Sequence, residues 1–131
     1  AVLSIGLKYL PEWINKRKVI GRRYIAEITN PMITMQMHPE NTDPVYHLFV
    51  ITVENADDLI TYMSDRGIEC NKHYPVPCHL QKAYAHLGYK EGDCPNAEHL
   101  AKHCVTLPLF PEMTEDEVTM VIDECNAYNR N

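Results

Sequence analysis

Two histidines and a tyrosine lie together in a short segment that contains two prolines. His73 and Tyr74 directly precede Pro75, and His79 follows Pro77 by two residues. Neither proline fits the interior of a helix or a central strand, so we expect a rigid, irregular loop. Loops of this kind often hold functional groups against a pocket. His73, Tyr74 and His79 are therefore the candidate binding residues. The alternative is packing within the loop and, for His79, anchoring of the helix that follows.

A second group of side chains has a spacing that occurs in zinc sites. His99 and His103 are four residues apart on an expected helix, with Cys94 and Cys104 nearby. That spacing can bring two imidazoles to one helix face. However, no glutamate follows His99 as in a His-Glu-x-x-His pattern, and no Cys-x-x-Cys pair is present, so we predict no metal site.

A cysteine nucleophile is also unsupported by the sequence. Cys78 lies next to His79, and adjacent side chains rarely adopt the in-line geometry that activation of a thiol requires. No third group that would orient the histidine is evident.

The composition excludes several classes of protein. The 131 residues suffice for one domain, and 12 Lys plus Arg against 18 Asp plus Glu give a net charge of -6. An acidic domain repels phosphate backbones and anionic lipid, and the apolar stretches are too short to cross a bilayer, so we predict neither nucleic acid nor membrane as a partner. The five cysteines are odd in number and scattered, which predicts a reducing, cytoplasmic location.

The elements that must position these residues follow from periodicity and capping signals. We expect a helix over residues 1–28, kinked or restarted at Pro11, and strands over 33–37, 45–53 and, briefly, 68–71. Further helices are expected after Asn55, over 78–87 and 96–103, and after Thr114, which forms a capping box with Glu117. The order predicts an α+β fold with a small, mainly antiparallel sheet and helices packed on one side.

The chain begins without methionine, inside an apolar run. It reads like the middle of a helix from which an upstream part has been removed. We therefore divide it into a linking helix region, 1–28, and a C-terminal small domain, 29–131. Leu3, Leu7 and Leu10 are expected to form an exposed apolar patch.

Several spaced motifs together resemble the C-terminal part of the DegT/DnrJ/EryC1/StrS sugar aminotransferases. The resemblance covers essentially the whole chain, which corresponds to the last third of a typical member. Its motifs, in order, are Leu10, Trp13, Arg17 through Tyr24, Val45-Tyr46-His47-Leu48-Phe49-Val50, Gly67-Ile68, His73-Tyr74-Pro75-Val76-Pro77-Cys78-His79-Leu80-Gln81, Ala83-Tyr84, Leu87-Gly88-Tyr89, Gly92-Asp93, Pro95, Ala97-Glu98, Leu107-Pro108-Leu109-Phe110-Pro111 and Thr114. Cys94 and Thr106 depart from the residues that are usual before Pro95 and Leu107.

The resemblance implies the small domain of a fold-type-I aminotransferase that depends on pyridoxal phosphate. Such an enzyme moves an amino group, usually from glutamate, to a keto-sugar carried on a nucleotide diphosphate. It also implies a homodimer whose active sites borrow residues across the interface. The loop with His73 would close over the substrate side of the coenzyme, where His73 could hydrogen-bond the sugar or its diphosphate.

In that family the lysine that binds pyridoxal phosphate covalently lies in the large N-terminal domain, with most phosphate contacts. None of the lysines of this chain stands in that context, so no catalytic and no cofactor-binding residue is predicted here. These lysines are Lys8, Lys16, Lys18, Lys72, Lys82, Lys90 and Lys102.

Two other functions are compatible with the sequence. One is transamination of a keto substrate without a nucleotide, such as a cyclitol or an aminohydroxybenzoate precursor. The other is a standalone, non-catalytic binding or interaction module derived from an aminotransferase.

Overall fold

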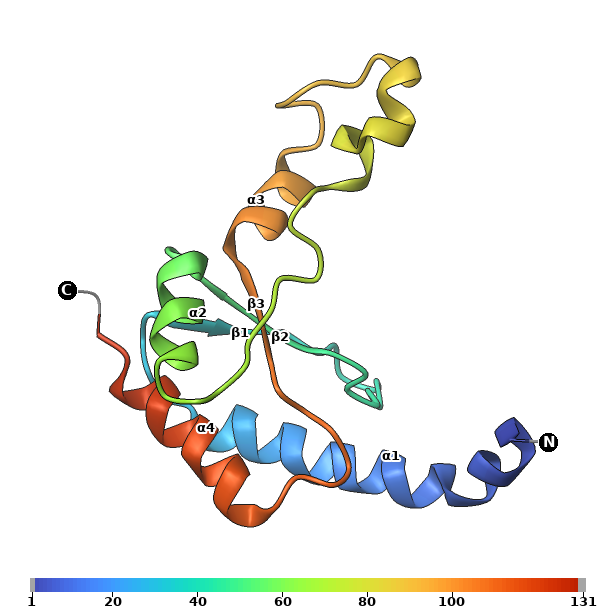
Figure 1. Cartoon of the computed structure of the whole chain (residues 1–131), viewed down its shortest axis with the longest axis vertical. Coiled ribbons are helices and arrows are strands. Elements are labelled where there is room, and N and C mark those ends of the chain that lie inside the picture. The colour runs from blue at the N-terminus through green and yellow to red at the C-terminus, as the bar shows by residue number, and fades with distance from the viewer. Residues whose placement is uncertain (1, 130–131) are drawn as a thin grey trace.

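The protein, a computed structural model, is described over residues 2–129 and combines a small sheet, helices and a long projection (Figure 1). The elements in chain order are α1 (Val2–Glu27), β1 (Ile33–Met35), β2 (Phe49–Val53), α2 (Ala56–Ser64), the 3-10 helices η1 (Cys78–Leu80) and η2 (Lys82–Leu87), α3 (Pro95–His103), β3 (Cys104–Leu107) and α4 (Glu115–Ala127).

The sheet has three antiparallel strands in the order β1-β2-β3. In the register, Ile33 lies opposite Val53, and Phe49 lies opposite Leu107. Along β2, Phe49, Ile51 and Val53 are buried while the residues between them are half-buried, as expected for a sheet with one covered face.

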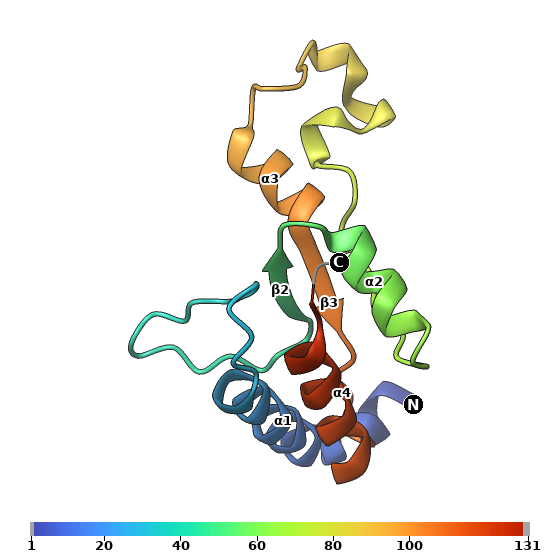
Figure 2. The same cartoon turned by 90° about the vertical axis from the view of Figure 1, so that its left-hand side faces the viewer.

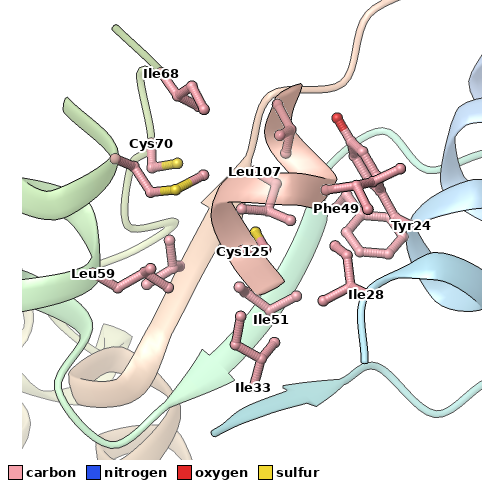
Figure 3. Packing of buried hydrophobic residues seen from close by; sticks show 14 of the residues in the cluster. Tyr24, Ile28, Ile33, Phe49, Ile51, Leu59, Ile68, Cys70, Leu107 and Cys125 are labelled. Carbon is pink, nitrogen blue, oxygen red and sulfur yellow. The ribbon is translucent and has the colours of Figure 1, made fainter. Parts of the chain in front are cut away.

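The covered face of the sheet packs against α1, α2 and α4 (Figures 1 and 2). Figure 3 shows the centre of this core, where Tyr24 of α1, Leu59 of α2 and Cys125 of α4 converge on strands β2 and β3. The Tyr24 and Phe49 rings meet edge to face with their centroids 5.1 Å apart, a favoured aromatic geometry. The predicted α+β class, with helices on one side of the sheet, is confirmed.

Local signals at the helix starts are confirmed as well. The Asn55 side chain accepts a hydrogen bond from the Asp58 amide and begins α2. Thr114 and Glu117 form the complete capping box of α4, in which each side chain accepts from the other residue's backbone amide.

Two strand predictions are wrong. The third strand is not 68–71 but Cys104–Leu107, and from the predicted segment only Asn71 pairs with it, as an isolated bridge to Thr106. The second strand begins at Phe49 rather than at residue 45, since Tyr46 has a positive φ of 49° that no strand accommodates. α1 also continues through Pro11, and its first turns bend away from the rest of the helix in Figure 1.

The C-terminal half of α1 belongs to the same core as the sheet. Arg17 donates hydrogen bonds to the carbonyls of Tyr46 (3.1 Å) and Leu109 (2.9 Å), and the Tyr24 hydroxyl donates to the Pro108 carbonyl (2.8 Å). A Cβ atom at Gly21 would lie 2.6 Å from the Tyr46 ring, so this close approach requires glycine.

All five cysteines are free thiols. Burial raises the pKa of Cys70 and of Cys125 to about 12, so these two thiols stay protonated and unreactive. No helix within residues 2–129 is long and apolar enough to cross a membrane.

Two asparagines fasten the end of α1 to the end of α4. The Asn126 carbonyl oxygen accepts from the Thr29 (2.7 Å) and Asn30 (3.2 Å) amides, and its amide group donates to the Glu27 carbonyl (2.9 Å). The Asn30 side chain donates in return to the carbonyls of Cys125 and Tyr128, both at 2.8 Å.

We therefore expect Asn126→Ala to lower the free energy of unfolding of this chain by about 1–2 kcal/mol, because three backbone groups lose their partner. Urea denaturation followed by circular dichroism measures this. Asn15→Ala, at an exposed position of α1, is the matched control and should change stability little. Equal effects of both substitutions would contradict the role assigned to Asn126.

Candidate functional site

The segment between α2 and β3 projects from the domain as an arm, defined here as residues 72–103. It rises from one edge of the sheet through η1 and η2 and returns along α3 (Figures 1 and 2). Residues 81–93 of this arm are all exposed. The arm carries all three predicted binding residues, His73, Tyr74 and His79.

The base of the arm is attached to the domain at three points. Asn71 and Thr106 exchange backbone hydrogen bonds of 2.7 and 3.3 Å. The Lys72 ammonium pairs with the Asp57 carboxylate at 2.8 Å. The His73 Nδ1 atom lies 2.9 Å from the Thr106 hydroxyl. Because these contacts run to β3 and α2, they fix the direction in which the arm leaves the domain.

His73 and Tyr74 lie together at this base. Their ring centroids are 5.4 Å apart with the planes nearly perpendicular, and the peptide bond between them is cis. His73 is half-buried, whereas Tyr74 is 69% exposed. The two side chains thus present polar groups on the surface beside the sheet, where a ligand held by another part of the protein could reach them.

The Glu98 carboxylate holds the outer part of the arm together. It accepts from the Gly92 amide (2.9 Å), from the Cys94 amide (3.1 Å) and from His79 Nε2 (3.0 Å). These hydrogen bonds, the one from Gly92 first, lower the pKa of Glu98 below its ordinary value. Glu98 of α3 thereby holds both η1 and the loop that leads into α3 in place.

His79 is engaged inside the arm rather than on its surface. Its side chain is only 8% exposed, with Nε2 on Glu98 and its ring edge against Tyr89. This contact agrees with the anchoring role considered for His79, although the partner is on α3. A direct role of His79 in substrate binding stays a prediction, and the structure does not bring His79 into contact with His73.

Within the arm, the loop and α3 border an open hollow of about 540 Å³. Its walls are the prolines of the loop and one face of α3; the lining residues include Pro75, Pro77, Leu80, His99 and Lys102. Charged groups of both signs also line it, among them Glu98 and Lys102.

The His99 and His103 rings lie against each other on this side of α3, with centroids 4.3 Å apart and planes tilted by 31°. His103 Nδ1 is hydrogen-bonded to the carbonyls of Val53 and Glu54, so this ring fastens α3 to the end of β2. Within residues 2–129, no group of three or more metal-ligating side chains converges.

Comparison with known proteins shows to which family this chain belongs. The profile of the DegT/DnrJ/EryC1/StrS aminotransferase family matches residues 1–126. This chain belongs to that family.

Two curated transaminases illustrate the similarity. The dTDP-3-amino-3,4,6-trideoxy-alpha-D-glucose transaminase of Streptomyces venezuelae is 37% identical over 129 residues, which cover 98% of this chain and 34% of the relative. The dTDP-3-amino-3,6-dideoxy-alpha-D-galactopyranose transaminase of Aneurinibacillus thermoaerophilus is 34% identical to this chain, and the match covers 35% of that relative. The chain thus spans about a third of the length of these relatives.

Solved structures agree in fold. The crystal structure of S. venezuelae DesV matches 96% of this chain with a TM-score of 0.93 at 35% identity, and 34% of DesV is covered. A structure described as the putative sugar aminotransferase Spr1654 of Streptococcus pneumoniae, in its PLP form, matches 94% of this chain with a TM-score of 0.82 at 28% identity, and 33% of it is covered. The small sheet with its helices and arm therefore corresponds to one part of these larger aminotransferase structures.

The family depends on pyridoxal phosphate, but residues 2–129 do not form a site that fits this coenzyme. Lys16, Lys18 and Lys72 are paired with carboxylates. The other four lysines are exposed and therefore unsuited to covalent catalysis, which requires a partly desolvated amine; they are Lys8, Lys82, Lys90 and Lys102.

Two residues important for the arrangement, Glu98 and Thr106, entered the sequence analysis only through the family resemblance, and no contact or function was predicted for either. Glu98 lies in the first turn of α3, where an acid that accepts from preceding amides is a common signal. That signal could have indicated the contact with Cys94 but not the contact with His79. Thr106 carried no signal, because its partner His73 is 33 residues away.

We expect Glu98→Gln to loosen the outer arm without unfolding the domain, because the charged acceptor shared by three donors is lost. Hydrogen exchange at Gly92 and Cys94 should become faster by about tenfold, while amides of β2 keep their protection. Glu91→Gln, on the same loop, is the control and should leave the exchange unchanged.

The same contacts predict a pH dependence in the wild-type chain. Because the pKa of Glu98 is lowered by folding, its contribution is complete above the ordinary value of 4.5 and is lost as the pH falls through the lowered value. Protection factors of the Gly92 and Cys94 amides should therefore fall in acid before those of β2. If the Gly92 and Cys94 amides lost protection at the same pH as the amides of β2, Glu98 would not be the residue that specifically holds the arm together.

Proposed function

We propose that residues 29–131 are the C-terminal small domain, and residues 1–28 the linking helix, of a pyridoxal-phosphate-dependent aminotransferase. The whole enzyme transfers an amino group from glutamate to a keto-sugar carried on a nucleotide diphosphate. The observation that carries this proposal is the match to nucleotide-sugar transaminases along nearly the whole chain, over only a third of their length. Pyridoxal phosphate is bound by the part of the enzyme that precedes this chain.

In this proposal the arm contributes to the substrate side of the active site. His73 and Tyr74 contact the nucleotide-sugar, with His73 hydrogen-bonded to the sugar or its diphosphate. The partial exposure of both side chains, at a base fixed to the sheet, supports these roles. His79 acts from inside the arm, where its contact with Glu98 supports the shape of the loop that carries the other two.

Two exposed apolar surfaces support the presence of further partners. The first half of α1 exposes Leu3 (85%), Leu7 (64%) and Leu10 (41%), as the sequence predicted. The arm exposes Tyr84, Leu87 and Tyr89, each by about half. Surfaces of this kind are normally covered. We propose that the large domain covers α1 and that a second subunit meets the arm, in a cytoplasmic homodimer.

The proposal predicts that this chain alone forms no stoichiometric adduct with pyridoxal phosphate at any one lysine, because its lysines are ion-paired or exposed and none has, within residues 2–129, a neighbouring site that would hold the coenzyme in place. The absorbance spectrum of the mixture, followed by borohydride reduction and intact-mass measurement, tests this. The whole enzyme, treated in the same way, should carry one coenzyme per subunit. A stoichiometric adduct at one lysine of this chain would overturn the proposal that the coenzyme is bound outside this chain.

Substrate class is tested with the whole enzyme, glutamate and a dTDP-linked keto-sugar, by following the formation of 2-oxoglutarate. We expect turnover that requires the nucleotide. Equal turnover of a keto-cyclitol would favour transamination without a nucleotide. If the whole protein transaminated neither substrate, the result would favour the non-catalytic binding or interaction module.

A further inference from the structure

Thr106 links the sheet to the candidate substrate-binding residue. Thr106 lies opposite Val50 of β2 on one side, and its backbone amide and carbonyl exchange hydrogen bonds with Asn71 on the other. Its side chain is buried, with 7% of the residue exposed, and its hydroxyl lies 2.9 Å from His73 Nδ1. Both edges of the strand are thus occupied at Thr106, and the hydroxyl is held in place by the sheet.

The direction of this hydrogen bond follows from the surroundings of the hydroxyl. Within the part of the chain that the structure describes, the Thr106 hydroxyl has no other hydrogen-bond partner than His73. A buried hydroxyl that fails to donate its proton costs free energy. The unprotonated Nδ1 of a neutral imidazole is an acceptor, whereas a protonated Nδ1 is not. The arrangement is satisfied when the hydroxyl donates to Nδ1.

We infer that Thr106 is a positioning residue that sets the tautomer of His73. With Nδ1 as acceptor, the proton of the neutral ring resides on Nε2. This atom is not buried, and no partner for it is present within residues 2–129. His73 therefore presents an N–H donor to its ligand, fixed in direction by the sheet.

The tautomer defines the chemistry that His73 recognises. An Nε2–H donor suits an oxygen acceptor, and a negatively charged one gives the stronger hydrogen bond. Of the two contacts proposed for His73, the diphosphate of the nucleotide-sugar fits this donor better than a sugar hydroxyl. This step rests on the proposed function, whereas the tautomer itself does not.

The tautomer is measured on this chain by long-range ¹H–¹⁵N correlation of histidine-labelled protein, at a pH where His73 is neutral. We expect the Nε2–H form in the wild type and in Thr106→Ser, which keeps the hydroxyl. Thr106→Val keeps the β-branched shape but removes the donor, and it should shift His73 toward a mixture of tautomers. His86, exposed on the arm, serves as an internal reference that no variant should change.

A wild-type His73 with its proton on Nδ1 would overturn the inference, whether or not any variant folds. So would an unchanged tautomer in Thr106→Val.

Kinetics of the whole enzyme separate the inference from the proposed function. We expect His73→Ala to raise KM for the nucleotide-sugar by about tenfold and Thr106→Val to raise it by a smaller factor. The double variant should be no worse than His73→Ala, since Thr106 acts through His73. A changed tautomer in Thr106→Val with KM unaltered in all three variants would contradict the substrate role of His73 while upholding the positioning by Thr106.

Discussion

The short strand β3 is the constraint on which the arrangement of this domain depends. All four of its residues are buried, and its backbone pairs with β2 along one edge and with Asn71 on the other. Buried amides and carbonyls must find partners, so this pairing is strongly specified. Both stems of the arm meet here, because Asn71 leads into His73 and α3 runs directly into Cys104. The placement of the candidate site is therefore a consequence of how one strand satisfies its backbone.

Beyond this base, the arm is held by polar contacts rather than by a core of its own. None of residues 72–100 is fully buried, and Ala101 is the first residue of the returning helix to be so. Instead of apolar packing, the Glu98 carboxylate stabilises this part by accepting hydrogen bonds from two backbone amides and one imidazole. Such a segment keeps its shape but opens more readily than the sheet. That combination suits the contacts with substrate and with a second subunit that we propose for this arm.

The sequence predicted well what depends on neighbouring residues and poorly what depends on distant ones. The caps at Asn55 and Thr114 involve partners three residues away, and both were predicted. The strand at 104–107 was missed because it is buried on both faces and shows no alternation, and it directly follows a helix. Ile68 and Cys70 are both apolar and buried, with the exposed Glu69 between them, and this alternation is also typical of a strand. The contacts of His73 with Thr106 and of His79 with Glu98 cross 33 and 19 residues, so only the fold brings these groups together.

In the proposed enzyme, an arm anchored to the sheet brings His73 to the substrate of a larger aminotransferase. A crystal structure of the whole enzyme with a bound nucleotide-sugar would show whether His73 reaches that substrate. We expect His73 to keep its contact with Thr106 and its Nε2 to lie within about 3.2 Å of a substrate oxygen. A substrate bound with no contact to this arm in either subunit, or a His73 ring turned away from Thr106, would contradict this proposal.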